Sequence, residues 1–333
     1  MHVLFLIFAL SMYGAAATEQ AGPSAVERWQ QQMNLGQQYQ DSGHYLEAQE
    51  HFQSALRAAG GLSPNDPRNF VTRVALGLVT EAVGQYTEAE QWDNSAIRLG
   101  QEIYGAGHAE LAVPFTNLAV LYRDQGEYGR AEDYCRRALA LIRGKGAPKG
   151  LAHVLGTLGG ILYHRGKLAE AESSLQESIQ IAEGLQSSEI VAGDLSNLAA
   201  VYAEKGRRAE ALSTLQRAYT AYESTGGSNH PNLFFVLADM AALQAASGDY
   251  EKAVRSVESG IRIAENDGAG NTMLVGNALT AEAGWLHKLK RDSEAKRVRA
   301  KAKLVTKTAA RNSYSQYTVD ARQVARSAAP PSE

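Results

Sequence analysis

The sequence predicts an all-α protein in which about seven helix-turn-helix units stack into a solenoid, and three regularities indicate this fold. An alanine recurs at intervals of 40 to 42 residues, in the copies Ala48, Ala89, Ala131, Ala171, Ala211, Ala253 and Ala295. A glycine stands five residues before that alanine in the first six copies. A large apolar residue followed by a small one stands thirteen residues before it, again in six copies. A nearly constant period of this length is typical of repeat architectures.

The third copy, residues 117–141, shows why these residue types recur. Residues three or four apart share a face of a helix, so Leu118, Ala119 and Tyr122 form an apolar stripe on a first helix. After the turn at Gly126, a second stripe consists of Ala131, Cys135 and Ala138. Small side chains allow two helices to approach closely. One hairpin cannot bury such stripes on both of its sides, so we expect each unit to stack on its neighbours.

The segment before the repeats has the pattern of an export signal. Residues 3–14 form an apolar run too short to anchor the chain in a bilayer, and three alanines precede Thr18. We expect a signal peptide over residues 1–17, cleaved after Ala17, and hence a secreted or periplasmic protein without a stable membrane span after cleavage. The first residues contain His2 but no Lys or Arg, so a mis-assigned start or an uncleaved membrane anchor is the alternative.

The remaining chain divides by composition. A short leader, 18–28, precedes the repeats at 29–310, and the last of these repeats is degenerate. Residues 311–333 are polar and lack the repeat, so we expect a mobile tail there. The net charge of −3 argues against a nucleic-acid partner. One basic stretch, from Lys288 to Lys307, is interpreted as the solvated face of a terminal helix or as a docking patch.

Residues capable of catalysis or metal binding do not form a recognisable motif. His108 and His230 recur at matching positions between repeats, but no further ligands stand near them at metal-site spacing. Cys135 occupies a position that is apolar in other copies, which favours a buried hydrophobe over a nucleophile. Polar residues before prolines, as at Asp66 and His230, indicate helix starts. We therefore expect no enzyme activity, no metal site and no cofactor.

Two segments carry a family resemblance. The strings LGQQYQDSGHYLEAQEHFQSA at 35–55 and LAVLYRDQGEYGRAEDYCRRA at 118–138 resemble the tetratricopeptide repeat (TPR). The period of 40 to 42 residues and the connectors at 62–70, 104–112 and 226–234 look like those of kinesin light chain repeats. The resemblance implies a right-handed α-solenoid whose first helices line a concave groove. Departures from the pattern are Thr80, Asp93, Arg208, Glu282, Lys290 and Arg299; the last three suit a capping repeat that faces water.

The resemblance also implies a binding groove, because in this family the residue before the recurring leucine faces a bound peptide. Here that position holds Asn34, Ala75, Asn117, Thr157, Asn197, Asp239 and Ala281. A side-chain amide can both donate to and accept from a peptide backbone, although these asparagines could instead bond one another or water. Small residues nearby could form a groove floor, with Tyr163 and Phe235 as anchors and Arg123 as a charged contact, or could simply tighten the packing of the helices.

We therefore expect a non-catalytic scaffold, exported from the cytoplasm, that binds a protein or peptide of unknown identity in this groove. The alternative is a regulatory or docking subunit of an envelope or secretion assembly that uses the basic last repeat. Binding through that basic repeat should weaken steeply with ionic strength, whereas amide and aromatic contacts in the groove should not.

Overall fold

The computed structural model describes residues 24–327, and the side chains of residues 24–310. Over this range the chain forms fourteen α-helices and two short 3₁₀ helices, η1 (Ala109–Leu111) and η2 (Gly227–Asn229), and no strand. The structure divides into two units, one up to Leu185 and one from Gln186 onward, and each is described by itself. Together they contain seven helical hairpins, which confirms the all-α solenoid architecture of helix-turn-helix units.

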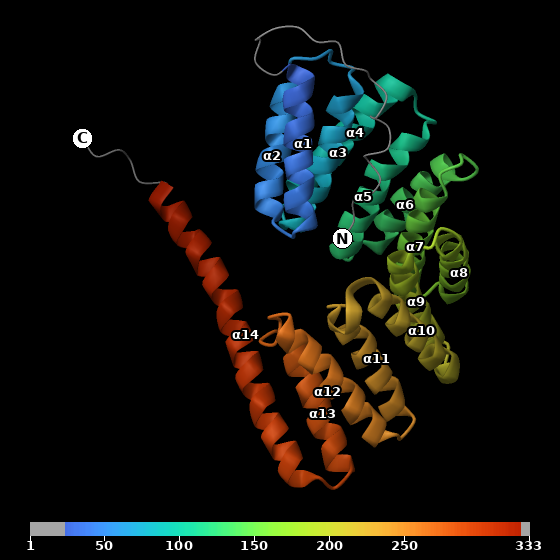
Figure 1. Cartoon of the computed structure of the whole chain (residues 1–333), viewed down its shortest axis with the longest axis vertical. Coiled ribbons are helices and arrows are strands. Elements are labelled where there is room, and N and C mark those ends of the chain that lie inside the picture. Colours follow the sequence, from blue (N-terminus) through green and yellow to red (C-terminus); the bar gives the residue numbers. More distant parts are fainter. Residues whose placement is uncertain (1–23, 328–333) are drawn as a thin grey trace. The chain divides into compact units, whose positions relative to one another are not determined.

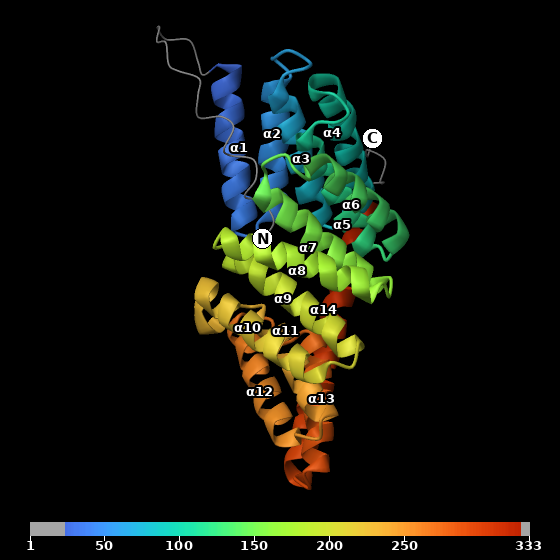
Figure 2. The same cartoon turned by 90° about the vertical axis from the view of Figure 1, so that its right-hand side faces the viewer.

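The first unit contains four hairpins. Their helices are α1 (Ala25–Asp41), α2 (Tyr45–Ala59), α3 (Pro67–Ala82), α4 (Tyr86–Tyr104), α5 (Ala112–Asp124), α6 (Tyr128–Ile142), α7 (Pro148–His164) and α8 (Leu168–Gly184). The second helix of each hairpin contacts the first helix of the next. Helices α1 to α4 accordingly lie as successive neighbours in both views (Figures 1 and 2). First helices also contact one another, α3 against α5 and α5 against α7, so they share one face of this unit.

The second unit contains three hairpins. Their helices are α9 (Ser188–Glu204), α10 (Arg208–Gly226), α11 (Leu233–Ala246), α12 (Tyr250–Asn266), α13 (Met273–Lys288) and α14 (Asp292–Ser327). The hairpins again stack through α10 on α11 and α12 on α13. Helix α14 is 36 residues long and continues past α13 (Figure 1). The predicted tail at 311–333 therefore begins within this helix, and its mobility stays a prediction.

Every hairpin turns through a left-handed backbone position. The six glycines of the repeat, Gly43, Gly84, Gly126, Gly166, Gly206 and Gly248, all have positive φ, between 71° and 83°. This conformation is open to glycine without the steric cost that a Cβ brings. In the last hairpin Lys290 takes the same position with a φ of 63°, so the turn persists although its glycine is lost.

The predicted stripes form the core. Leu118, Ala119, Ala131, Cys135 and Ala138 are all completely buried. Gly36 and Gly159 stand where first and second helices cross, and a larger residue at either position would collide with the facing side chain. A Cβ added at Gly36 would lie 2.5 Å from the ring of Phe52, and one added at Gly159 would lie 2.5 Å from Cγ of Leu175.

An ion cluster joins the third and fourth hairpins. The side chain of Glu132 on α6 is only 4% exposed and is bound by three cations, Arg136, Arg165 and Lys167. The Lys167 ammonium lies 2.8 Å from one carboxylate oxygen of Glu132 and 3.0 Å from the other. Burial alone would raise the pKa of Glu132, but the hydrogen bonds from these cations lower it to about 2. Because Arg136 comes from α6, and Arg165 and Lys167 come from the turn between α7 and α8, the cluster stabilises the stacking of adjacent repeats.

Of three helix starts compared with the sequence predictions, two differ and one agrees. Helix α1 begins at Ala25, earlier than the expected 29, because Ser24 and Glu27 form a capping box. Asp66 caps α3 as predicted, by accepting a hydrogen bond from the backbone N–H of Arg68. His230 caps only a loop N–H, that of Asn232, and α11 begins at Leu233, so the predicted helix start at Pro231 was wrong.

Two further expectations concern the chain ends. Glu282, expected to face water in the last repeat, is buried at 4% exposure, and burial raises its pKa to about 7. The predicted signal peptide, 1–17, and most of the leader lie outside the described residues. Over residues 24–327, no helix is both long and apolar enough to cross a membrane.

Candidate functional site

The predicted groove residues of the first unit lie on three first helices. Asn34 on α1 is exposed, and its carboxamide oxygen accepts a hydrogen bond from Gln30, one turn earlier. Tyr163 on α7 is half-buried and makes an edge contact with the ring of His164. Arg123 on α5 is half-buried and pairs with its neighbour Asp124, with 2.7 Å between the charged atoms. Asn34 and Tyr163 thus keep open surface that a partner could contact.

Asn117 differs from the expectation of a side chain that faces a bound peptide. It is buried, and its carboxamide nitrogen donates a hydrogen bond of 3.0 Å to Asp93 on α4. Asp93 occupies the position that Phe52 and Leu175 hold in other repeats, and it packs on Gly77. The substitution of an aspartate for an apolar residue therefore takes the Asn117 amide away from the open face.

Asp93 and Glu81 are two acidic side chains whose pKa values are both raised. Burial raises the pKa of Asp93 well above its usual range; the hydrogen bond from Asn117 opposes this shift and the charge of Glu81 adds to it. Burial and the nearby Asp124 raise the pKa of Glu81 to about 7, against the effect of Arg123. In the sequence, Asp93 is recognisable only as a departure from the repeat, and its contact with Asn117 is not, because the two residues belong to different repeats.

The predicted residues of the second unit are more open. Asn197 on α9 and Asp239 on α11 are exposed, and so is Phe235, one helical turn before Asp239, at 50%. The Phe235 ring makes an edge contact with the buried Phe234, which holds it at the helix surface. Although Asp239 is reached by solvent, neighbouring protein desolvates its carboxyl and raises its pKa. These three side chains lie on first helices and are available to a partner.

The remaining candidates for chemistry have structural roles. Cys135 is completely buried, and burial raises the pKa of its thiol to about 12, which confirms the interpretation as a core residue. The ring of His108 stacks on Tyr104, and that of His230 lies tilted against Tyr222, each pair with centroids 4.8 Å apart. In residues 24–310, whose side chains are described, His, Cys, Asp and Glu form no group of three that could hold a metal ion.

Comparisons with known proteins agree with this architecture. Residues 116–328 match the MalT-like TPR region, and residues 32–99 and 69–144 match the tetratricopeptide repeat. No curated protein matches the chain significantly in sequence.

Two solved structures with TM-scores above 0.5 show the same fold at low sequence identity, and a third structure matches with a lower TM-score. BtubC (BKLC) from P. vanneervenii is 19% identical, with 74% of this chain and 93% of BtubC covered and a TM-score of 0.55. A putative kinesin light chain from Podosopora anserina is 21% identical, with 60% and 97% covered and a TM-score of 0.48. A Rap protein in complex with competence and sporulation factor is 12% identical, with 86% and 79% covered and a TM-score of 0.61.

Proposed function

Since the chain belongs to the tetratricopeptide repeat proteins, we propose that it is a non-catalytic scaffold that binds a protein or peptide partner along its first helices. The observation that carries this proposal is the open surface of α9 and α11. Asn197 offers an amide to a peptide backbone, and Phe235 offers an apolar anchor beside Asp239. The Rap protein, whose fold is similar, is itself found in complex with competence and sporulation factor.

Export from the cytoplasm is part of the same proposal. It is supported by the apolar run at 3–14 and the small residues before Thr18, the pattern of a cleaved signal. The mature protein would then meet its partner outside the cytoplasm.

Site-specific photo-cross-linking in the source cells tests the groove. A benzophenone side chain at position 197 or 235 is expected to capture one discrete partner protein, whereas the same group at Ser213, exposed on the second helix α10, is not. Phe235→Ala should abolish the cross-link from position 197, because an anchoring aromatic typically carries about 2 kcal/mol of binding free energy. Equal capture from position 213 would contradict the proposal. Mass spectrometry of the purified protein reads its N-terminus at the same time: Thr18 supports export, and an intact Met1 on protein recovered from the soluble cytoplasmic fraction contradicts it.

The second candidate is docking through the last repeat. Helix α14 carries the exposed Lys296, Lys303 and Lys307 around Leu304, which is 66% exposed. Such a surface suits an acidic partner, for example a subunit of an envelope or secretion assembly. If capture at position 197 fails and a pull-down on the whole chain loses its partner steeply between low and high salt, this candidate is favoured.

A further inference from the structure

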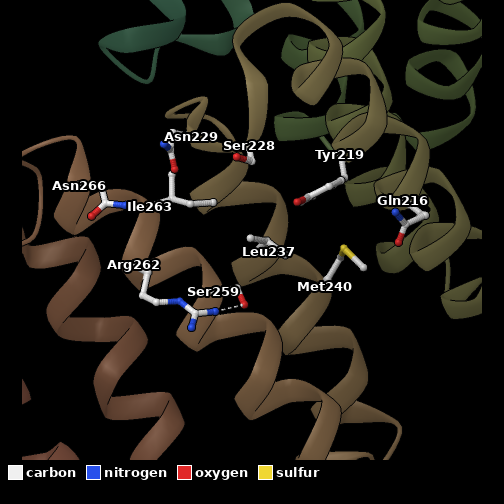
Figure 3. A pocket seen from close by; sticks show the side chains of 10 residues that line it. All are labelled: Gln216, Tyr219, Ser228, Asn229, Leu237, Met240, Ser259, Arg262, Ile263 and Asn266. Atoms are coloured by element: carbon white, nitrogen blue, oxygen red, sulfur yellow. Dashed lines mark hydrogen bonds between the residues drawn. The ribbon is translucent and has the colours of Figure 1, made fainter.

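A cavity of about 450 Å³ lies within the second unit, between α10, η2, α11 and α12 (Figure 3). Its apolar lining consists of Leu237 and Met240 from α11 and Ile263 from α12. Polar groups surround this lining: the Tyr219 hydroxyl points toward the middle of the cavity, and Asn229, Arg262 and Asn266 stand around it. The cavity thus combines an apolar surface with several hydrogen-bond donors, as ligand sites commonly do.

The wall formed by η2 is held in place by the connector before α11. Gly227 has a φ of 69°, and a Cβ added at Gly226 would lie 2.5 Å from the ring of His230. That ring lies tilted against the ring of Tyr222, and its Nδ1 accepts a hydrogen bond from the backbone N–H of Asn232. These contacts place Ser228 and Asn229 over the cavity without help from a ligand, so this wall is preorganised.

Another hairpin of the same protein shows what normally fills this space. When Ala253 is aligned on Ala131, Leu237 corresponds to Phe115, and Ile263 to Leu141. Phe115 and Leu141 pack against the buried cluster that contains Phe70, Val74, Ala96 and Leu111. Three of the polar residues also have apolar or small counterparts there: Ala106 for Ser228, Gly107 for Asn229 and Ala140 for Arg262. The two connectors share a left-handed glycine, Gly105 in one and Gly227 in the other. Apolar side chains pack beside the first connector, whereas the second borders a cavity with polar walls.

The charge of the lining indicates the class of ligand. Arg262 is the single ionisable cation among the lining residues, and no Asp or Glu is among them. Its guanidinium donates one hydrogen bond, of 2.9 Å, to Ser259, which orients it and leaves its other N–H groups for a ligand. Because the lining offers one guanidinium beside neutral amides and a phenol, its charge matches a single carboxylate better than a doubly charged phosphate.

We propose that this cavity binds a ligand in which a carboxylate adjoins a small aliphatic group, such as the C-terminal residue of a peptide or a small organic acid. The carboxylate pairs with Arg262 and accepts hydrogen bonds from Asn229 or Asn266, while the aliphatic group lies on Leu237, Met240 and Ile263. None of the seven predicted groove residues lines this cavity, so the site is separate from the groove, and its failure would leave the proposed function standing.

Methyl NMR of the full chain tests this site, because three of its lining residues carry methyl groups. N-acetyl-L-leucine, at up to about 10 mM, should shift the methyl resonances of Leu237, Met240 and Ile263. N-acetyl-L-leucinamide, which lacks only the charge, should bind at least about tenfold more weakly. A hexapeptide that ends in leucine, with a free or an amidated C-terminus, distinguishes the two possible ligands. If the peptide with the free C-terminus binds more tightly than acetylleucine, the ligand is a peptide C-terminus. If the two bind equally, the ligand is a small organic acid.

Two variants of the same helix complete the test. Arg262→Gln should weaken binding of acetylleucine at least about tenfold. Arg255→Gln, which removes an exposed arginine of α12 outside the cavity lining, should leave it unchanged and serves as the matched control. The proposal is overturned if the acid and its amide bind alike, if Arg262→Gln binds as the native chain does, or if the three methyl groups do not move at the highest concentration.

Discussion

Replacement of Gly159 by alanine is expected to lower the free energy of unfolding of the first unit by about 2 kcal/mol. The added Cβ would lie 2.5 Å from Cγ of Leu175, which is completely buried, so the helices α7 and α8 would have to move apart or Leu175 leave its rotamer. This cost outweighs the gain of about 1 kcal/mol that alanine brings to a helix over glycine. Urea unfolding followed by circular dichroism measures the change.

The matched control is Gly129→Ala on α6. Gly129 is also helical, but a Cβ there would meet no atom within 4 Å. With no collision to offset it, the helix propensity of alanine should stabilise the protein by about 0.5 to 1 kcal/mol. A similar loss of stability in both variants would mean that close helix crossing is not the reason for glycine at position 159.

The substitution Glu132→Gln is expected to cost about 2 to 3 kcal/mol at neutral pH, because it leaves three cations without their common anion. The cost is held below that of a fully buried pair because the side chains of Arg136, Arg165 and Lys167 keep between 36% and 45% of their surface exposed.

The pH dependence of stability provides a separate check on Glu132. Its pKa falls from 4.5 to about 2 on folding, so the stabilisation is present above pH 4.5 and is lost as the pH falls toward 2. The free energy of unfolding, measured with urea at several pH values between 2.5 and 6, should therefore change less with pH in Glu132→Gln than in the native chain. An equal change in both chains would contradict the assignment of this ion cluster.

The repeat fold is readable from the sequence because its determinants are local and periodic. The turn glycines and the two apolar stripes, one with Leu118 and one with Ala131, follow from spacing alone, and the structure confirms them. Even the turn at Lys290, where the glycine is lost, keeps the backbone of the other copies, since stacking on the preceding hairpin continues. The capping box at Ser24 and Glu27 could also have been recognised and would have placed the start of α1.

Contacts between repeats could not be predicted in the same way. The pattern marked Asp93 as unusual, yet only the packing of α4 on α5 shows that it binds the amide of Asn117. Likewise, Glu132 and Arg136 form an evident pair within one helix, but Arg165 and Lys167 come from the next hairpin. The cavity at Arg262 leaves no motif in the sequence, because its amides and hydroxyls come from α10, α12 and the η2 connector, where such residues are ordinary.

Far-UV circular dichroism of one excised hairpin, residues 112–142, tests most directly whether the repeats depend on one another for their core. Helices α5 and α6 bury Leu121 and Cys135 in the full chain, but stacking on α4 and α7 supplies part of that burial. We expect the excised hairpin to have little helix and no cooperative thermal transition, while residues 24–185 remain helical and unfold cooperatively. An excised hairpin with the helicity of the full unit and a sharp transition of its own would contradict this account.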